Sequence, residues 1–340
     1  MYLIGYDIGS SSVKAALVEV SSGEKVAVCQ YPDEEMSMHS AQPGWAEQDP
    51  KAWWDAVKKA SNKLFQSVAV TPSDVKAIGI SYQMHGLVLV DEKKEVLRPA
   101  IIWCDSRAVE IGNSAFTALG TKQCLGCLLN SPGNFTASKL RWVRENEPDL
   151  YQKAYKMMLP GDYIAMKMTD RITTTVSGLS EGMLWDFNEE KVADFLLEHY
   201  DLDTHLVPEI SDTFANQGVL TPEAADQLGL PQGTPVGYRA GDQPNNALSL
   251  NVFEPGEIAA TGGTSGVVYG VVDRPLFDEK MRVNSFAHVN HTAEKARIGV
   301  LLCINGAGIQ YNWMRQMLAT DGESYEAIES RVRHIPVGAD

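Results

Sequence analysis

The stretch that decides the fold is Gly237-Tyr238-Arg239-Ala240-Gly241-Asp242-Gln243-Pro244-Asn245-Asn246-Ala247. An apolar approach leads into it, a glycine precedes its single acidic residue, and small residues follow. This pattern predicts a strand, a tight turn and a helix. In an open α/β sheet, ligands collect at the carboxyl ends of the strands, so a carboxylate at this turn is well placed for chemistry. Asp also commonly opens helices, so Asp242 has two interpretations of equal weight here, a reactive group or a helix cap.

Two hairpins rich in glycine and hydroxyl side chains have a common plan. The first, in residues 2–18, runs from an apolar strand through Asp7-Ile8-Gly9-Ser10-Ser11 to Lys14 and a second apolar strand. The second, in residues 258–269, repeats this plan, and Thr261-Gly262-Gly263-Thr264-Ser265 aligns with the first turn. Backbone amides in such turns form concavities that bind anions. One such hairpin is usually only a turn, but two matching hairpins favour a weak internal repeat that opens each of two lobes.

Length and charge restrict the class of protein. A chain of 340 residues exceeds the usual size of one domain, which favours two lobes. Lys and Arg number 29 against 44 Asp and Glu, and the net charge of −15 argues against nucleic acid or an anionic membrane as the main partner. No apolar run approaches the length of a membrane span, and no basic segment precedes the first strand, so we expect a cytoplasmic protein.

The cysteines and histidines give only a weak metal signal. Cys124 and Cys127 have a spacing that redox sites and half of a zinc site share, but no second pair accompanies them. Their neighbours are apolar, so we favour buried free thiols. His288 and His291 lack a third ligand at useful spacing and are interpreted as strand and turn residues.

Periodicity and capping signals predict further elements. Asp49-Pro50 reads as a helix start with proline at the first helical position, and residues 75–80 as a strand that delivers Met84 and His85 to its end. We place the boundary between the lobes near Arg239, which gives domains at 1–239 and 240–340. The other predicted elements are a hairpin at 88–97, helices at 136–144, 191–200 and 307–318, a strand–turn–helix step at 156–163 and a strand at 298–304.

Six motifs carry a resemblance that runs along the whole chain. Each is weakly specific, but in their order and spacing they resemble the FGGY carbohydrate kinases, and within that family the xylulokinases most closely. The resemblance implies an α/β, actin-like ATPase (ribonuclease H-like) fold in two lobes. It also implies ATP and Mg²⁺ as the phosphoryl donor and its metal ion. The motifs are residues 7–14, Gln83-Met84-His85-Gly86, residues 98–107, residues 135–143, Gly241-Asp242-Gln243 and Gly263-Thr264-Ser265-Gly266.

The reaction that the resemblance implies is transfer of the γ-phosphoryl group of ATP to a hydroxyl of a ketopentose, with D-xylulose giving D-xylulose 5-phosphate as the expected case. A sugar hydroxyl is a poor nucleophile at neutral pH, so a carboxylate should take its proton, and Asp242 is the candidate base. Asp7 is the second candidate catalytic residue and is expected to hold Mg²⁺ through water, with Asp242 as the other carboxylate at the metal. The residues expected to bind the phosphates are Gly9, Ser10, Ser11, Lys14, Gly263, Thr264 and Ser265.

The sugar is expected to bind to the first lobe. A histidine beside apolar strands is usually structural, but the resemblance implies that Met84 and His85 contact the sugar. Trp103 either stacks on the sugar or packs in the core, and the two interpretations have equal weight. Asp105 is expected to accept hydrogen bonds from sugar hydroxyls, and Gln243 is expected to contribute to sugar binding.

Three positions depart from the pattern of the xylulokinases. Ser10 stands where the family usually has threonine, which keeps the hydroxyl, whereas Gln243 replaces the usual asparagine and Gly161 the usual lysine. The last two leave open another pentulose, a polyol or a sugar acid as the acceptor. From a different class, an actin-like nucleotide-binding module without a sugar acceptor is the alternative, against which Met84 and His85 argue. A third hypothesis is an inactive fragment that still binds sugar.

The last residues, Ile335-Pro336-Val337-Gly338-Ala339-Asp340, correspond in the family to a point inside the second lobe, before the segment that holds adenosine. The resemblance therefore implies a truncated second lobe. We expect such a chain to bind its sugar weakly and ATP poorly. An incomplete sheet exposes an edge and apolar surface, which favours self-association, and a homodimer is the assembly left open.

Overall fold

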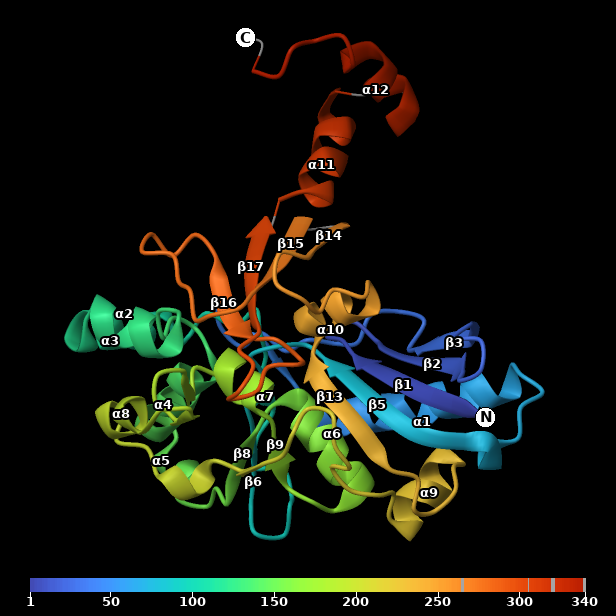
Figure 1. Ribbon diagram of the computed structural model, residues 1–340, viewed down its shortest axis with the longest axis horizontal. Coiled ribbons are helices and arrows are strands. Elements are labelled where there is room, and N and C mark those ends of the chain that lie inside the picture. The colour runs from blue at the N-terminus through green and yellow to red at the C-terminus, as the bar shows by residue number, and fades with distance from the viewer. Residues whose placement is uncertain (264–265, 305, 319–321, 339–340) are drawn as a thin grey trace.

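The computed structural model describes residues 1–340 apart from 264–265, 305, 319–321 and 339–340, and it contains two main sheets surrounded by helices (Figure 1). The larger sheet has the strand order β13-β5-β1-β2-β3. β2 is antiparallel to both of its neighbours, whereas β1, β5 and β13 run parallel to one another. These strands are β1 (Tyr2–Ile8), β2 (Val13–Glu19), β3 (Lys25–Tyr31), β5 (Val75–Tyr82) and β13 (Val236–Gly241).

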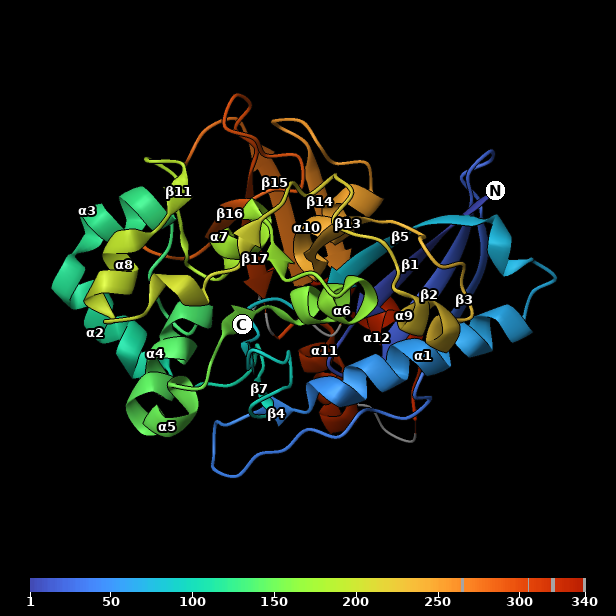
Figure 2. The ribbon, with the colours of Figure 1, turned by 90° about the horizontal axis from the view of Figure 1, so that it is seen from below.

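The alternation of apolar residues explains how this sheet packs. Ile4, Tyr6 and Ile8 of β1 are buried, because every second side chain of a strand points to the same face. The helices α1 (Pro50–Gln66), α6 (Pro160–Thr169) and α9 (Pro222–Leu228) contact one another beside the sheet (Figure 2). α1 begins as the sequence predicts, with proline at its first position and the Asp49 carboxylate accepting from the Lys51 amide at 2.9 Å.

The chain between the strands of the large sheet forms short elements. The predicted helix at 136–144 is confirmed as α4 (Thr136–Asn146). The predicted helix at 191–200 is partly wrong, because its first two residues pair as β11 with β10, and α8 begins only at Asp194. The strands of this part are β4 (Glu47–Gln48), β6 (Val88–Val90), β7 (Ala100–Ile101), β8 (Lys156–Met158), β9 (Thr173–Thr174), β10 (Trp185–Asp186), β11 (Lys191–Val192) and β12 (Glu209–Ile210). The remaining helical elements are η1 (Pro72–Asp74), α2 (Val109–Leu119), α3 (Thr121–Gln123), η2 (Cys124–Leu128), α5 (Pro148–Tyr151), α7 (Val176–Glu181), α8 (Asp194–His199) and η3 (Thr204–Leu206).

The second sheet follows the Asp242 turn and has the order β14-β15-β17-β16. Helix α10 (Asp242–Ser249) contacts strands of both sheets, and one hydrophobic cluster includes residues on both sides of the turn. Beyond β17, two helices stand away from the body and have no buried residue among those described (Figure 1). These elements are β14 (Ile258–Gly262), β15 (Gly266–Val272), β16 (Asn284–Ala287), β17 (Ile298–Ile304), α11 (Gly308–Leu318) and α12 (Tyr325–Val332).

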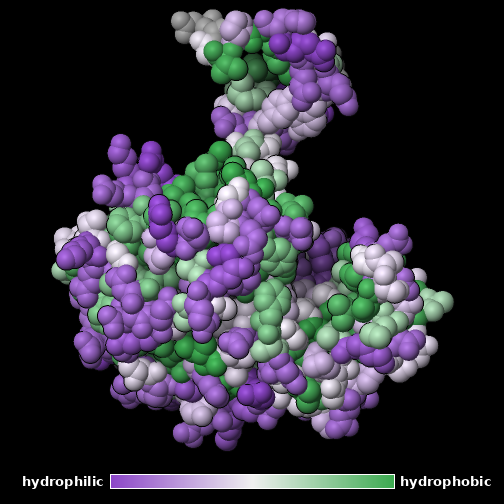
Figure 3. All heavy atoms as spheres, viewed as in Figure 1, coloured by the Kyte–Doolittle hydropathy of each residue, from purple (hydrophilic) through white to green (hydrophobic). Residues whose placement is uncertain are grey.

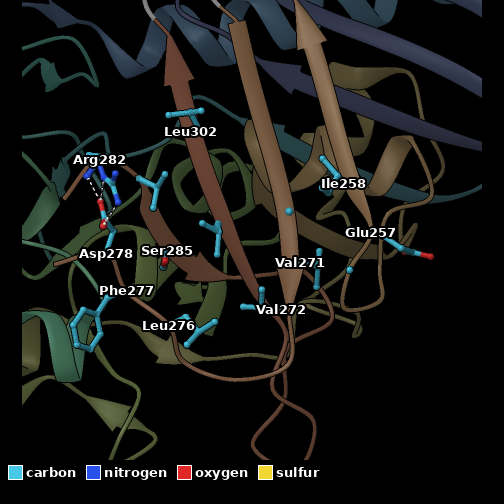
Figure 4. A pocket seen from close by; sticks show the side chains of 14 residues that line it. Glu257, Ile258, Val271, Val272, Leu276, Phe277, Asp278, Arg282, Ser285 and Leu302 are labelled. Atoms are coloured by element: carbon cyan, nitrogen blue, oxygen red, sulfur yellow. Dashed lines mark hydrogen bonds and ion pairs between the residues drawn. The ribbon is translucent and has the colours of Figure 1, made fainter. Parts of the chain in front are cut away.

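Part of the second sheet leaves apolar side chains exposed, as the sequence predicts. Ile258 of β14 is 65% exposed, and hydrophobic surface gathers where β15 and β17 run toward α11 (Figure 3). A groove of 710 Å³ lies against the same strands, and the Asp278–Arg282 ion pair stands at its rim (Figure 4). None of the residues that line this groove belongs to the predicted site.

The cysteines agree with free thiols. Cys124 is buried and Cys127 is half-buried in the π-helical turn η2, and neither forms a disulfide. Within the described ranges, no helix is long and apolar enough to cross a membrane.

Candidate active site

Three parallel strands end at one edge of the large sheet. In the register of the sheet, Ile8 of β1 and Gly241 of β13 both lie opposite Tyr82 of β5. Neighbouring strands are about 4.8 Å apart, so the backbones at the ends of β1 and β13 are roughly 10 Å apart. The register therefore brings Asp7 and Asp242 to the same edge, although they lie far apart in the sequence.

Asp242 is the first residue of α10, and Gly241 occupies the N-cap position, so the interpretation of Asp242 as a helix cap is wrong. Burial and, to a smaller extent, the negative charge of Asp7 together raise the pKa of Asp242 to about 7, although hydrogen bonds from Gln243 act in the opposite direction. A carboxyl group whose pKa lies near neutral pH is suited to accept a proton during a reaction.

Asp7 has a more polar environment than Asp242. Its side chain is 38% exposed, and the Lys14 ammonium lies 3.4 Å from its carboxylate. The two site carboxylates therefore differ, one desolvated and the other solvated and paired. Such a division separates the functions of two carboxylates in one site.

Gly241 lets the Asp242 turn approach the predicted sugar-binding residues. A Cβ atom at this position would lie 2.5 Å from Met84 Cγ and 2.5 Å from Glu181 Oε2, so a larger residue would displace both. Met84 is 4% exposed, which gives it a packing role beneath the turn. Glycine at 241 is therefore required by the close contact and not by an unusual backbone angle.

His85 follows β5 with a φ of 62°, a left-handed conformation that residues other than glycine rarely adopt. Its Nδ1 lies 2.9 Å from the Glu181 carbonyl oxygen, and its ring stands edge-on to Phe135 at 4.7 Å. Burial and, to a smaller extent, the nearby Lys139 together lower the pKa of His85 to about 3. The imidazole is therefore neutral at pH 7, and because Nδ1 must donate to the carbonyl, Nε2 is left as a hydrogen-bond acceptor.

Trp103 is 51% exposed, so the prediction that it packs in the core is wrong. Its Nε1 lies 3.5 Å from Ser10 Oγ, which places the indole beside the first glycine-rich hairpin. An exposed indole next to a cluster of polar groups is suited to stack on the apolar face of a sugar ring.

The prediction for Asp105 does not fit the structure. Its carboxylate is fully buried and accepts hydrogen bonds from the Ala46 amide at 2.6 Å and from the Arg107 guanidinium at 2.7–3.0 Å. A sugar hydroxyl cannot reach it, because these partners and the burial enclose both oxygens. Asp105 instead fixes the loop that carries Trp103.

The first hairpin turn is held by the surrounding chain. The Gly9 amide donates to the Ser12 carbonyl at 3.1 Å, and Gln48 Nε2 donates to the Ser10 carbonyl at 2.6 Å. The Ser11 carbonyl accepts from the Met36 amide at 2.7 Å. The Gly9 amide is therefore committed to the turn, and the binding of phosphates by Gly9, Ser10 and Ser11 stays a prediction.

The second hairpin is described only in part. The Gly263 carbonyl accepts a hydrogen bond from the Gly308 amide at 2.9 Å, which joins the turn to the start of α11. Thr264 and Ser265, which the sequence predicts to bind phosphate, lie outside the described residues.

The carboxylates at this edge fit a magnesium ion. Among the described residues, no group of three or more His, Cys, Asp or Glu side chains could hold a metal ion. Mg²⁺ does not need such a group, because it keeps several waters and is usually bound by one or two carboxylates together with substrate phosphates. Asp7 and Asp242 supply two carboxylates, and their repulsion, which contributes to the raised pKa of Asp242, is what a cation would relieve.

The departure at Gly161 has a steric explanation. A Cβ atom there would lie 2.1 Å from the Tyr82 ring, so Tyr82 occupies the space that a longer side chain would need. The Tyr82 hydroxyl is hydrogen-bonded to Glu181, whose own pKa is raised well above its usual range by burial and by nearby carboxylates. A buried phenol and carboxyl pair therefore lies behind the Asp242 turn.

Sequence reasoning missed two buried residues next to the site, Glu181 and Lys139. The burial of Lys139 could have been predicted, because this residue falls on the same face of its helix as Phe135 and Val143, where an apolar residue is expected. Glu181 gave no such signal, since it ends a short helix with no regular pattern.

Comparisons with known proteins identify the family to which this fold belongs. The profile of the FGGY family of carbohydrate kinases, N-terminal domain, matches residues 2–249. The chain therefore belongs to the FGGY family of carbohydrate kinases, which have the actin-like ATPase fold.

Individual relatives are more specific. The xylulose kinase of Escherichia coli is 33% identical over 285 residues, which are 84% of this chain and 57% of that protein. The crystal structure of xylulose kinase from Rhodospirillum rubrum matches with a TM-score of 0.88 and 26% identity over 100% of this chain and 68% of that one. A gluconate kinase from Lactobacillus acidophilus matches with a TM-score of 0.87 and 24% identity over 99% of this chain and 66% of that one, and it shows the fold alone. This chain thus spans 57% of the length of the Escherichia coli relative.

Proposed function

We propose that this chain carries the sugar site and the catalytic carboxylate of an ATP-dependent kinase that phosphorylates a ketopentose, D-xylulose in particular. The observation that supports the proposal best is the meeting of two carboxylates in different environments at one sheet edge, next to Met84, His85 and the exposed Trp103. Relatives named xylulose kinase support the choice of sugar. We also propose a cytoplasmic location, where ATP is available.

In this proposal each residue has a definite task. Trp103 stacks on the sugar, and the Nε2 lone pair of the neutral His85 accepts a hydrogen bond from a sugar hydroxyl. Ionised Asp242 takes the proton from the attacking hydroxyl as its oxygen approaches the γ-phosphorus. Asp7 and Asp242 would hold Mg²⁺, which when bound neutralises charge on the phosphate oxygens. Lys14 adds a positive charge beside Asp7.

The two hairpins and the lobe boundary complete the proposal. We assign Gly9, Ser10, Ser11, Gly263, Thr264 and Ser265 to the phosphates of ATP, and residues 1–239 and 240–340 to the two lobes. The family profile ends at residue 249, within α10, which supports a boundary near the Asp242 turn.

A specific observation favours a second class of acceptor. Tyr82 fills the space above Gly161, and Gln243 interacts with the base itself, so both departures touch the sugar side of the site. The same fold is shared by a protein named gluconate kinase. A sugar acid is therefore the second candidate.

The test is ATP-dependent phosphorylation of a panel of D-xylulose, D-ribulose, glycerol and D-gluconate by this chain beside a C-terminally extended version, with Asp242→Asn as the control for the site. We expect D-xylulose to give the highest kcat/KM, and the Asn variant to be inactive on every acceptor. Calorimetric titration with the same panel reports sugar binding even where turnover is low. ATP hydrolysis that no sugar stimulates, without sugar binding, would support the nucleotide-binding module instead.

A further inference from the structure

Lys139 is a buried cation that the proposed chemistry does not use. It lies in α4, is fully buried, and its Nζ donates to two backbone carbonyls, those of His85 at 2.8 Å and Ile102 at 3.0 Å. Burial of a lysine is costly, because its charge leaves water, so a fully buried lysine needs compensating interactions. Asp105 and Glu181 supply negative charge nearby.

The two carbonyls belong to the two loops that carry the sugar-facing side chains. His85 is itself one of these residues, and Ile102 immediately precedes Trp103. One loop follows β5 and the other follows β7. α4 comes later in the chain than both loops. A single ammonium group therefore ties together the backbones on which both side chains are mounted.

Both loops need such a support. His85 has a left-handed backbone that is unfavourable for residues with a side chain, so its conformation must be fixed by contacts. Trp103 is half-exposed, so packing alone does not hold it. Burial lowers the pKa of Lys139 to about 7, so both the ammonium and the neutral amine occur near neutral pH. Both forms carry N–H donors for the two carbonyls, and these hydrogen bonds can fix both backbones.

We propose that Lys139 is a positioning residue of the sugar site, whose ammonium group holds the His85 and Trp103 loops in a fixed relation so that both side chains meet the sugar. The proposal rests on the proposed function for its ligand but not for its geometry. Lys139 does not touch the sugar, since it is fully buried. Its effect is therefore on sugar affinity through the order of the two loops.

The test compares Lys139→Met with Arg141→Met, because Met matches the length of the lysine chain and has no N–H donor. Arg141 is a fair control, since it lies in the same helix and its guanidinium also donates to a backbone carbonyl, that of Tyr200, away from the sugar site. Two quantities are measured, the affinity for D-xylulose by calorimetry and hydrogen exchange of the amides at residues 84–87 and 102–105.

We expect Lys139→Met to weaken D-xylulose binding by about 10- to 100-fold, the range that follows from leaving buried carbonyls without donors. Exchange should become faster in both loops, whereas Arg141→Met should change neither quantity by more than about twofold. Unchanged affinity and unchanged exchange in Lys139→Met would overturn the proposal. Equal losses in both variants would also overturn it, because they would indicate a general loss of stability.

Two further outcomes of the experiment can also be interpreted. If the parent chain does not bind D-xylulose, the proposed substrate is wrong, and the exchange of the two loops still decides the role of Lys139. If Lys139→Met does not fold, Lys139→Gln takes its place, since its side chain is polar but one atom too short for its N–H group to reach both carbonyls. Faster exchange confined to the two loops in that variant supports the proposal, and parent-like exchange contradicts it.

Discussion

The two glycine-rich hairpins have the same local plan and different surroundings. Ile4 and Ile258 occupy corresponding places in the aligned repeats, yet Ile4 is 1% exposed and Ile258 is 65% exposed. β1 lies between β2 and β5 in the larger sheet, whereas β14 is an edge strand. The local pattern of turn residues therefore determines that a hairpin forms, whereas the burial of its strands depends on what packs against them. The repeat does not encode that second property.

The largest effect on turnover is expected from a substitution in the Asp242 turn, which lies between the two hairpins in the sequence. Asp242→Asn should lower kcat by at least about 100-fold, because removal of the proton is needed in the transition state. Sugar binding should stay within about tenfold of the parent, since the Asn side chain keeps nearly the same shape. Steady-state kinetics and calorimetric titration measure the two quantities, and near-normal turnover would exclude Asp242 as the base.

The same carboxylate predicts an acid limb in the pH profile. Asp242 has a pKa raised to about 7, and only its ionised form can accept a proton. kcat/KM should therefore rise with pH up to about 7 and lose about tenfold for each pH unit below it. A flat profile between pH 5 and 8 would show that another group accepts the proton.

The sequence predicted the parts of the fold that depend on local pattern. The strand at 298–304 and the helix at 307–318 match β17 and, within one residue, α11, because apolar periodicity and turn residues are local signals. The helix at 191–200 failed at its start, because Val192 pairs with Trp185, and pairing between strands is a tertiary effect.

Only part of the candidate site could be predicted from the sequence. The register of the parallel strands brings Asp7 and Asp242 to one edge, whereas from the sequence only the family resemblance placed both at the metal ion. The fate of Asp105 could not be read from the sequence, because it depends on Arg107 and the Ala46 amide folding around its carboxylate. Glu181 was missed for a similar reason, since only the tertiary structure brings it against Gly241.

A pair of substitutions in the two hairpins tests their difference in burial directly. Ile4→Ala should lower the free energy of unfolding by about 2–5 kcal/mol, because it opens a cavity in the core. Ile258→Ala should change it by less than about 0.5 kcal/mol, because that side chain is mostly in water. Denaturant unfolding measures both. An equal loss in the two variants would mean that the outer face of β14 is covered in solution, and light scattering would then report self-association.

A second matched pair of substitutions tests which lobe binds the sugar and which binds ATP. His85→Ala should raise the KM for the sugar by about tenfold or more with little change in the KM for ATP, because Nε2 is the free acceptor on the sugar side. His288→Ala is the control in the second lobe, where the imidazole hydrogen-bonds to Tyr269 and to the Val252 carbonyl inside the core. That variant should lose stability and keep its sugar affinity. A selective loss of nucleotide affinity in His85→Ala would reverse the assignment of the lobes.

The smallest effect is expected where the two hairpins differ by one charge. Lys14 aligns with Val268, so Lys14→Val gives the first hairpin the residue of the second and removes the ammonium 3.4 Å from Asp7. The ion pair is half-exposed, so the free energy of unfolding should change by less than about 1 kcal/mol. The KM for ATP should rise by about three- to tenfold and the sugar KM should stay constant, because our proposal assigns the Lys14 charge to the phosphate side of the site. The difference between variant and parent should shrink as salt is added, since screening weakens an exposed charge. A change in sugar KM alone would place Lys14 on the sugar side, and the two hairpins would then differ in ligand as well as in burial.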